Sequence, residues 1–482
     1  MSSATSVILV TLVAYKLLLI GVGVWASRRV ASEGDFFLAG ARGLGAWTAG
    51  LSYAASTSSA WVLLGFTGFV FTQGLVALWL VPGIFGGYVL TWLVMGPRLN
   101  AETRERGHLT VVDFLTTDAG RWARAIGLVA AAMILFCFVF YISSQFQAAG
   151  NALAEVFGLS ATEAVLIGAV VIVLYCLLGG FLAASVTDAL QAVVMMGACV
   201  VVPLAAVGAA GGAGAVFAAL ATDVSAYRSA TGGAAGMLGL GLALGLLGTG
   251  LGALGQPQLL NRIMAVRSPG ERLRGALITI GWGVVVYSGL VMLALAARAL
   301  SLDTGGEALF FASAQAFLPP VVAGLVVAAV LSAVMSTVDS LLLAAASAVS
   351  HDSGLRWATR SRALLMGRLS MVGVAVVAVG LTLFAPKDIF TRVLFSWVAL
   401  GAAFGPALLA RCLGLRVRGG AVLLAVVSGF TLAVAAYSVD GTAADVVEKW
   451  GSWALGGLIL FAGRERLTER RASPLQPGDQ DP

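Results

Sequence analysis

Charged residues are scarce in this chain of 482 residues: Asp, Glu, Lys and Arg together make 11%, whereas apolar residues make 59%. The mean hydropathy is +0.97. This composition excludes a large water-soluble catalytic domain, because soluble domains carry about 25% charged residues. At about 20 residues per crossing, the apolar residues suffice for on the order of a dozen membrane-spanning helices. We therefore expect an all-α integral membrane protein.

Cysteine and histidine are also rare. The four cysteines, Cys137, Cys176, Cys199 and Cys412, stand within apolar stretches, and there are only two histidines. Buried cysteines of this kind act as small apolar side chains, so neither a disulfide framework nor a Cys/His metal site is indicated. No nucleotide-binding glycine loop follows a strand and no nucleophile is paired with a histidine, so we do not expect an enzyme.

Apolar runs bounded by charge, glycine or proline predict thirteen spans. They cover about 4–26, 46–71, 74–96, 122–150, 160–182, 189–211, 234–261, 275–300, 317–350, 361–384, 388–412, 420–438 and 450–463. The first run lacks a basic leading segment and a small-residue cleavage site, so it is expected to be a retained helix and not a signal peptide.

Arginines mark alternate loops between these spans. If the amino terminus is outside, only six of the 29 Lys and Arg residues fall elsewhere than in the loops that then become cytoplasmic. Those six are Lys16, Arg228, Arg298, Lys387, Arg392 and Lys449. The positive-inside rule then predicts an outside amino terminus and a cytoplasmic carboxyl terminus. We assign the loop arginines, Arg262 among them, to orientation in the membrane and not to a nucleic-acid partner.

Two of the predicted spans are interrupted by small or polar residues. The second contains residues 52–59, with four serines and a threonine, and the seventh contains residues 248–257, with four glycines and a proline. The two spans are five apart, so they run in opposite directions across the bilayer. Broken helices at corresponding positions of two inverted repeats indicate a binding site at the middle of the membrane.

Polar groups inside hydrocarbon need a partner, a cavity or a ligand. The ninth span carries Ser336, Asp339 and Ser340 on one helix face, and Asp188 stands at the beginning of the sixth. Carbonyls, hydroxyls and carboxylates are hard oxygen donors, which suit an alkali cation. A single intramembrane serine more often bonds its own helix, whereas an intramembrane carboxylate favours a functional role.

Six motifs follow one another from about residue 35 to 410. They are Asp35-Phe36-Phe37-Leu38-Ala39-Gly40 with Arg42-Gly43-Leu44-Gly45; Leu51 and Ser52 through Ser58, Ala60 and Trp61, with Gly65 and Gly68; Gly179-Gly180-Phe181 with Thr187-Asp188 and Gln191; Gly255-Gln256-Pro257 with Arg262 and Met264-Ala265; Met335-Ser336-Thr337; and Gly401-Ala402-Ala403-Phe404-Gly405-Pro406. Together they resemble the bacterial sodium:solute symporter family, nearest its sodium/proline branch.

The resemblance implies thirteen spans with a LeuT-type core of two inverted five-helix repeats, each opening with a broken helix. The implied divisions are 1–45 (an extra helix and a loop), 46–211 (first repeat), 212–233 (outer loop), 234–415 (second repeat), 416–465 (two further helices) and 466–482 (a disordered cytoplasmic tail).

The resemblance also implies three sets of site residues. The sodium site would use the carbonyls of Ala55, Ser58 and Ala333 and the hydroxyls of Ser336 and Thr337. A second site, for a cation or a proton, would use Asp188, Asp339 and Ser340 together with Ser336. The solute would contact Ser56, Thr57, Tyr141, Gln145, Thr249, Ala253 and Pro257, of which Gln145 is inferred from its helical spacing to Tyr141.

The chain departs from the proline branch at three of these positions. Thr57 replaces an aspartate, and Thr249 and Ala253 replace an aromatic pair. Loss of the carboxylate removes a charge that favours sodium, so either Asp339 compensates for it or the coupling to sodium is weaker. Loss of two aromatic walls enlarges the solute pocket, so the solute stays open.

The expected function is sodium-coupled import of a small organic solute, an amino acid or a carboxylate-like compound, by alternating access. The expected location is the bacterial inner membrane, with sodium as the coupling ion and no obligate protein partner. Two alternatives stay open: a solute sensor or scaffold that kept the transporter fold, and a proton-coupled symporter that uses Asp339.

Overall fold

The computed structural model describes residues 43–178, 180–353, 360–384 and 388–465, together with several positions between 10 and 25. These parts are helical, and their only β pairing is two isolated bridges, Leu44 with Val266 and Val417 with Arg464. The prediction of an all-α chain is confirmed for the described residues.

Short π-helical turns (η1, η3, η7, η8) and 3₁₀ turns (η2, η4, η5, η6) connect or extend the α-helices. In the first half the elements are α3 (Ala46–Thr57), η1 (Trp61–Phe66), α4 (Thr67–Gln73), η2 (Gly74–Trp79), α5 (Leu80–Val89), η3 (Leu90–Met95), α6 (Gly96–Arg106), α7 (Val111–Thr116), η4 (Gly120–Trp122), α8 (Ala123–Phe157), α9 (Ala161–Leu178), α10 (Phe181–Ala209), α11 (Ala213–Thr222), α12 (Ser225–Arg228) and α13 (Gly236–Gly248). In the second half they are η5 (Thr249–Gly255), α14 (Pro257–Ala265), α15 (Pro269–Ala299), η6 (Gly306–Ala308), α16 (Leu309–Phe317), α17 (Pro320–Ser347), η7 (Ala348–Asp352), α18 (Arg360–Phe384), α19 (Ile389–Cys412), α20 (Gly419–Tyr437), α21 (Thr442–Val446), η8 (Val447–Gly451) and α22 (Ser452–Ala462).

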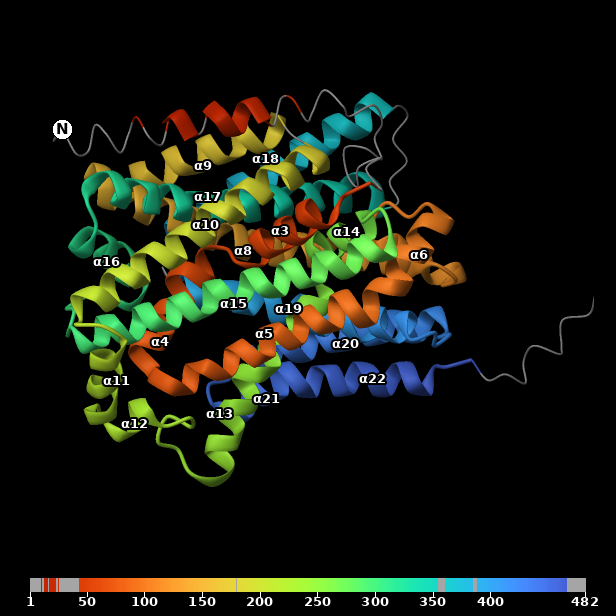
Figure 1. Ribbon diagram of the computed structural model, residues 1–482. Helices are drawn as coiled ribbons and strands as arrows, with labels where there is room; N and C mark the ends of the chain where they lie inside the picture. Colours follow the sequence, from red (N-terminus) through yellow and green to blue (C-terminus); the bar gives the residue numbers. More distant parts are fainter. Residues whose placement is uncertain are drawn as a thin grey trace, which may run out of the picture.

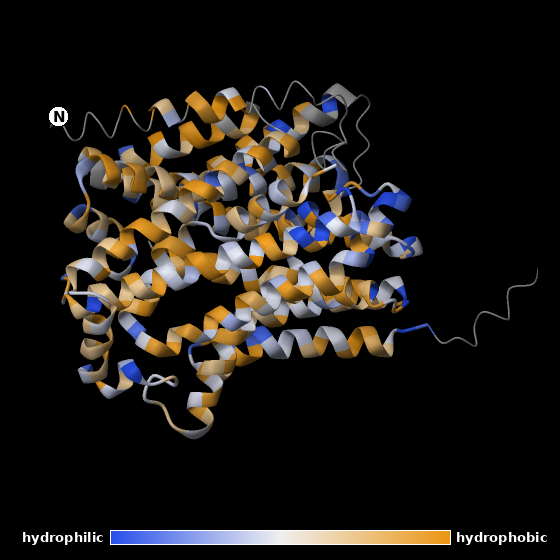
Figure 2. Cartoon of the chain, viewed as in Figure 1, coloured by the Kyte–Doolittle hydropathy of each residue, from blue (hydrophilic) through white to orange (hydrophobic). Residues whose placement is uncertain are grey.

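The long helices run roughly side by side, with α20 and α22 at one edge of the bundle and α9 and α18 at the other (Figure 1). Helices α17 and α19 lie inside the bundle. In their most apolar stretches 78% and 89% of the residues are buried, against 33% in α20. The flanks of the bundle are hydrophobic, while hydrophilic residues gather toward its ends (Figure 2). This is the distribution expected of helices that face lipid along their length.

Nine helices in the described part of the chain are long and apolar enough to cross a membrane. The predicted count of thirteen is therefore not established, and it stays a prediction. The first predicted span, at 4–26, and the tail at 466–482 fall largely or wholly outside the described residues.

Both predicted helix interruptions are confirmed. Helix α3 ends at Thr57, and Ser58 leaves the helical region with φ −106° and ψ 61° before the π turn η1 begins. In the second interruption α13 gives way to the 3₁₀ turn η5, Gln256 is extended, and α14 begins at Pro257. Proline fits the first position of α14 because its missing N–H has no partner there in any helix.

Glycines allow several close backbone approaches around these interruptions. Gly74, at φ +74°, ends α4 and separates the second predicted span from the third. Gly68 of α4 lies against Gly306 of η6, where a Cβ on Gly306 would stand 3.2 Å from the carbonyl oxygen of Gly68. The η6 turn therefore packs directly on the helix that follows the first interruption.

The predicted start of the sixth span is wrong. The sixth span was expected to begin at 189 with Asp188 at its start, but α10 begins at Phe181, after the extended Gly180. Asp188 thus lies two turns inside the helix and is buried. The hydropathy pattern failed here because it treats a carboxylate as the end of an apolar run.

Candidate functional site

The first interruption faces α17. Helix α3 packs against α10, α15 and α17, and the Ser336 hydroxyl of α17 lies 3.4 Å from the carbonyl oxygen of Ala55. The same hydroxyl is 3.2 Å from the carbonyl oxygen of Ala333. Ser336 is therefore within hydrogen-bond distance of two other residues of the predicted sodium site.

One further hydroxyl of that site has no partner among the described residues. The side-chain oxygen of Thr337 is buried and makes no hydrogen bond. A buried hydroxyl without a partner costs free energy, of the order of 1–3 kcal/mol. The Thr337 hydroxyl is a hard oxygen donor that a desolvated alkali cation accepts, so its chemistry fits the predicted ligand.

A buried ion pair lies beside this cluster. Arg262 of α14 donates from Nη2 to Asp188 Oδ2 of α10 at 2.9 Å, and the exposed fractions of the two side chains are 1% and 0%. Ser52 of α3 donates to the same carboxylate oxygen at 2.7 Å and accepts from Arg262 Nε at 3.1 Å. Arg262 also donates to the hydroxyl of Ser340 and to the carbonyl of Gln258.

The loop assignment of Arg262 is therefore wrong. The seventh span was predicted to end at residue 261, but α14 continues to Ala265 and holds Arg262 inside the protein. Pairing with Asp188 offsets the cost of burying the guanidinium, which a scan of local hydropathy does not include. The buried position of Arg262 could still have been predicted, because the intramembrane carboxylate Asp188 requires a positively charged partner.

The predicted second site thus already contains a guanidinium. Its residues Asp188 and Ser340 both accept from Arg262, and Ser340 Oγ lies 3.2 Å from Asp339 Oδ1. Asp339 Oδ2 and Asp188 Oδ1 are buried without a hydrogen-bond partner among the described residues. Two carboxylates and one guanidinium leave one negative charge unbalanced when both acids are ionised, so the cluster can take a proton or a second cation.

Several predicted solute residues gather at the first interruption. Gln145 of α8 accepts from the backbone amide of Ala60 at 3.2 Å. Tyr141, one turn earlier, lies 3.5 Å from the hydroxyl of Ser59. On the opposite side, Thr57 bonds the hydroxyl of Tyr88 of α5 at 3.1 Å.

Other predicted solute residues lie at the second interruption. Trp397 of α19 donates from its indole to the carbonyl of Thr249 at 2.9 Å, and the Thr249 hydroxyl is buried without a partner among the described residues. Gln256 bonds the carbonyl of Trp397 at 2.9 Å. Ala253 lies against Gly87 of α5, the helix that also carries Tyr88, so α5 contacts both interruptions.

Two members of the solute set are placed differently. Ser56 points to α17, where its hydroxyl lies 3.1 Å from that of Ser340, and so belongs with the carboxylate cluster. Pro257 is the first residue of α14, where its role is to restart the helix. Sequence reasoning missed Trp397 and Tyr88, which come from elements without a polar motif.

A model of the sodium:solute symporter family matches residues 36–427. The high-affinity proline transporter PutP of Bacillus subtilis is 32% identical over 399 residues, which cover 80% of this chain and 83% of that protein. The sodium/proline symporter of Escherichia coli K12 is 30% identical over 438 residues, 87% of this chain and 85% of that one.

A solved structure has the same fold. It is that of a Na⁺-coupled sialic acid symporter in a substrate-bound, outward-open state, with a TM-score of 0.78 over 96% of this chain and 99% of that chain. Its sequence identity is 16%, so the likeness concerns the fold alone.

The charge count in the buried cluster predicts an asymmetry between two substitutions. Arg262→Gln leaves two carboxylates without a cation, so we expect a loss of about 3–5 kcal/mol in the free energy of unfolding. Asp188→Asn leaves Arg262 with Asp339 nearby, and we expect a clearly smaller loss. The thermal unfolding of both purified variants in detergent measures the difference. Equal losses, or a larger loss for Asp188→Asn, would contradict this account of the cluster.

Proposed function

Because the chain belongs to the sodium:solute symporter family, we propose that it imports a small organic solute together with sodium by alternating access. Membership of this family makes the chain a transporter and not an enzyme, and it makes sodium the coupling ion. Its many apolar helices and bacterial relatives make it a multi-pass plasma-membrane protein.

The observation that carries the proposal is the contact between the broken end of α3 and the hydroxyl face of α17. We propose that sodium binds the carbonyls of Ala55, Ser58 and Ala333 and the hydroxyls of Ser336 and Thr337. An ion shared by the two helices braces the first interruption against α17. Support comes from the distances of Ser336 to the Ala55 and Ala333 carbonyls and from the unpartnered hydroxyl of Thr337.

Sodium then favours the state that binds solute. The coupling is reciprocal, because a solute that binds more tightly in the presence of sodium must also tighten sodium binding. One positive charge moving through 100 mV supplies about 2.3 kcal/mol, which corresponds to roughly fiftyfold accumulation before any sodium concentration gradient is counted.

The proposed solute site lies between the two interruptions, next to α5 and α8. Its candidate contacts are Thr57, Tyr141, Gln145, Thr249 and Ala253. Buried hydroxyl, amide and backbone groups of this kind suit a small polar solute such as an amino acid. Proline appears in the names of the relatives, but Thr249 and Ala253 replace an aromatic pair of the proline branch, which favours a different or bulkier solute.

We further propose an outside amino terminus and a cytoplasmic carboxyl terminus, with the two inverted repeats at 46–211 and 234–415. The distribution of arginines supports this orientation. The two interrupted helices, which open the proposed repeats, support the division.

A second ion at the carboxylate cluster is a further candidate. The unbalanced negative charge of Asp188, Asp339 and Arg262 favours an additional cation or a proton there. In this arrangement Ser340 and Asp339 bind the ion, and Arg262 holds Asp188 in place.

The direct test of the function is uptake into proteoliposomes. We expect an inward sodium gradient to accelerate the uptake of at least one labelled amino acid or carboxylate, relative to equal sodium on both sides. Choline chloride in place of sodium chloride is the control for ionic strength. If neither a sodium nor a proton gradient drives uptake of any tested solute, the symport proposal is wrong.

The sodium site predicts a change in ion affinity that needs no solute. Sodium stabilises the folded state by mass action, so the melting temperature should rise with sodium concentration. Ser336→Ala and Thr337→Ala should each raise the sodium concentration for half of this shift about tenfold, equivalent to about 1.4 kcal/mol. Ser347→Ala is the matched control, because Ser347 is a buried serine of the same helix that bonds its own helix at Ala344. An unchanged sodium response in both site variants would remove this assignment.

Substituting Asp339 by asparagine distinguishes the two candidate ions of the cluster. If the cluster binds sodium, Asp339→Asn should lower the steepness of the sodium-dependent melting shift from about two ions toward one. If it binds a proton, raising the pH in sodium-free buffer should destabilise the unsubstituted protein more than Asp339→Asn, because asparagine mimics the protonated acid. No change in either response would exclude an ion at Asp339.

A further inference from the structure

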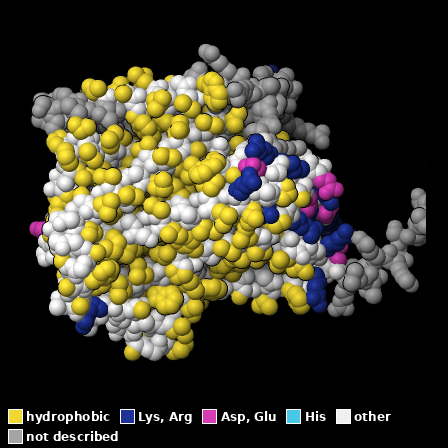
Figure 3. Space-filling model, viewed as in Figure 1, with side chains coloured by type: hydrophobic (Ala, Val, Ile, Leu, Met, Phe, Trp, Pro, Cys, Tyr) yellow, Lys and Arg dark blue, Asp and Glu magenta, His cyan; other side chains and the backbone are white. Residues whose placement is uncertain are grey.

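A cavity of about 290 Å³ lies at the arginine-rich end of the bundle, away from the proposed transport site. Its walls come from the ends of α6 and α19, the connections that follow α7 and α19, and the outer helices α20 and α22. Four arginines line it: Arg98, Arg106, Arg411 and Arg416. The face of the molecule in Figure 3 shows basic side chains concentrated at this end.

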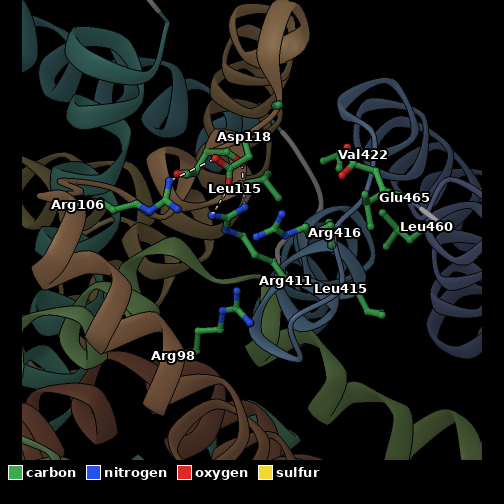
Figure 4. A pocket seen from close by; sticks show the side chains of 14 residues that line it. Arg98, Arg106, Leu115, Asp118, Arg411, Leu415, Arg416, Val422, Leu460 and Glu465 are labelled. Atoms are coloured by element: carbon green, nitrogen blue, oxygen red, sulfur yellow. Dashed lines mark hydrogen bonds and ion pairs between the residues drawn. The ribbon is translucent and has the colours of Figure 1, made fainter. Parts of the chain in front are cut away.

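The guanidinium groups of Arg98, Arg411 and Arg416 turn toward the same space (Figure 4). Like charges repel, so such convergence requires anions. Three carboxylates are present. Glu102 pairs with Arg98, Arg106 and Arg411, Asp118 pairs with Arg106 and Arg411, and Glu465 lines the cavity.

These carboxylates do not satisfy the donors. Arg416 is exposed and takes part in none of the ion pairs among the described residues, and Arg411 Nε is buried without a hydrogen-bond partner among them. Asp118 is already paired with Arg106 and Arg411. Burial disfavours its ionisation, but these two arginines outweigh that effect and hold the pKa of Asp118 below its usual value. The cavity therefore has N–H donors left for an incoming anion.

The position of these side chains is fixed by the fold. Arg411 donates from Nη1 to the carbonyl of Thr117 at 2.8 Å, and its guanidinium lies 5.0 Å from the centre of the Phe114 ring. The segment that carries Arg416 is fastened to the end of α22, because the amide of Glu465 donates to the Arg416 carbonyl at 3.0 Å. Gly414, at φ +89°, leaves room for the guanidinium of Arg98, which a Cβ there would approach to 2.8 Å.

The cavity lies against the two outer helices. Leu460 and Val422 line it from α22 and α20 and are buried, while the same helices expose Leu458 and Leu424. At the rim, Leu415 is exposed next to Arg416. Apolar side chains on the membrane side and guanidinium groups at headgroup level match an amphipathic anion, since arginine pairs readily with phosphate oxygens.

We propose that this cavity binds the phosphate headgroup of an anionic glycerophospholipid. The phosphate oxygens accept from Arg416, Arg98 and Arg411, and the acyl chains lie along the outer faces of α20 and α22. A bound headgroup would join the connection after α7 to the α19–α20 connection and to the end of α22.

The test is melting of the purified full-length protein in detergent with added lipid. We expect phosphatidylglycerol to raise the melting temperature at concentrations where phosphatidylcholine has little effect. Arg416→Gln should require at least tenfold more phosphatidylglycerol for the same rise, while Arg416→Lys should lose less. Arg416 makes no ion pair among the described residues, so its replacement leaves the internal contacts intact. Arg274→Gln is the matched control, because Arg274 is a 74% exposed arginine outside the cavity.

Three results would overturn the proposal. An equal phosphatidylglycerol response in Arg416→Gln and the unsubstituted protein would exclude the cavity as the site. An equal loss of response in Arg274→Gln would indicate non-specific charge attraction. Stabilisation by inorganic phosphate, with no additional effect of phosphatidylglycerol, would indicate a site for free phosphate and not for lipid. None of these readouts depends on transport, so they separate this inference from the proposed function.

Discussion

The structure depends on one buried charge pair, between Arg262 and Asp188. A guanidinium in the interior of a membrane protein is stable only if every donor has a partner. Here the partners come from α3, α10 and α17, while the guanidinium comes from the short helix α14. Helix α14, which follows the second interruption, is thereby linked to α3, which ends at the first interruption. A movement of α14 must either take these partners with it or expose the pair to water.

Local chemistry was enough to predict the two interruptions and the polar face of α17. The clustered serines and threonine around Ser58 compete for backbone hydrogen bonds, and the clustered glycines followed by Pro257 disfavour a continuous helix. Ser336 and Ser340 share a face because they are four residues apart. These features follow from neighbours in the sequence, so reading the sequence in short windows was sufficient to find them.

Long-range partners could not be predicted in the same way. Arg262 and Asp188 are 74 residues apart, and each alone indicates the end of a span. Trp397 reaches the second interruption because Gly252 has no side chain there to exclude its ring, and Gly252 lies far from it in the sequence. The same limit applies to the arginines at one end of the bundle. Their number predicts orientation, but their convergence on one cavity arises from packing between helices that the sequence does not place together.

The π turn at Trp61–Phe66, directly after the first interruption, determines the direction in which the side chains of α4 point. In an α-helix each residue advances the side-chain direction by about 100°, and a π turn accommodates one additional residue in the ladder of hydrogen bonds. Deleting a single residue from this turn would restore regular pairing and leave α4 facing the same way, whereas α-helical pairing that kept all six residues would rotate α4 by about that angle. Gly68 would then turn away from Gly306, and a bulkier side chain would meet the η6 turn. The π geometry of Trp61–Phe66 therefore determines which face of α4 meets the η6 turn.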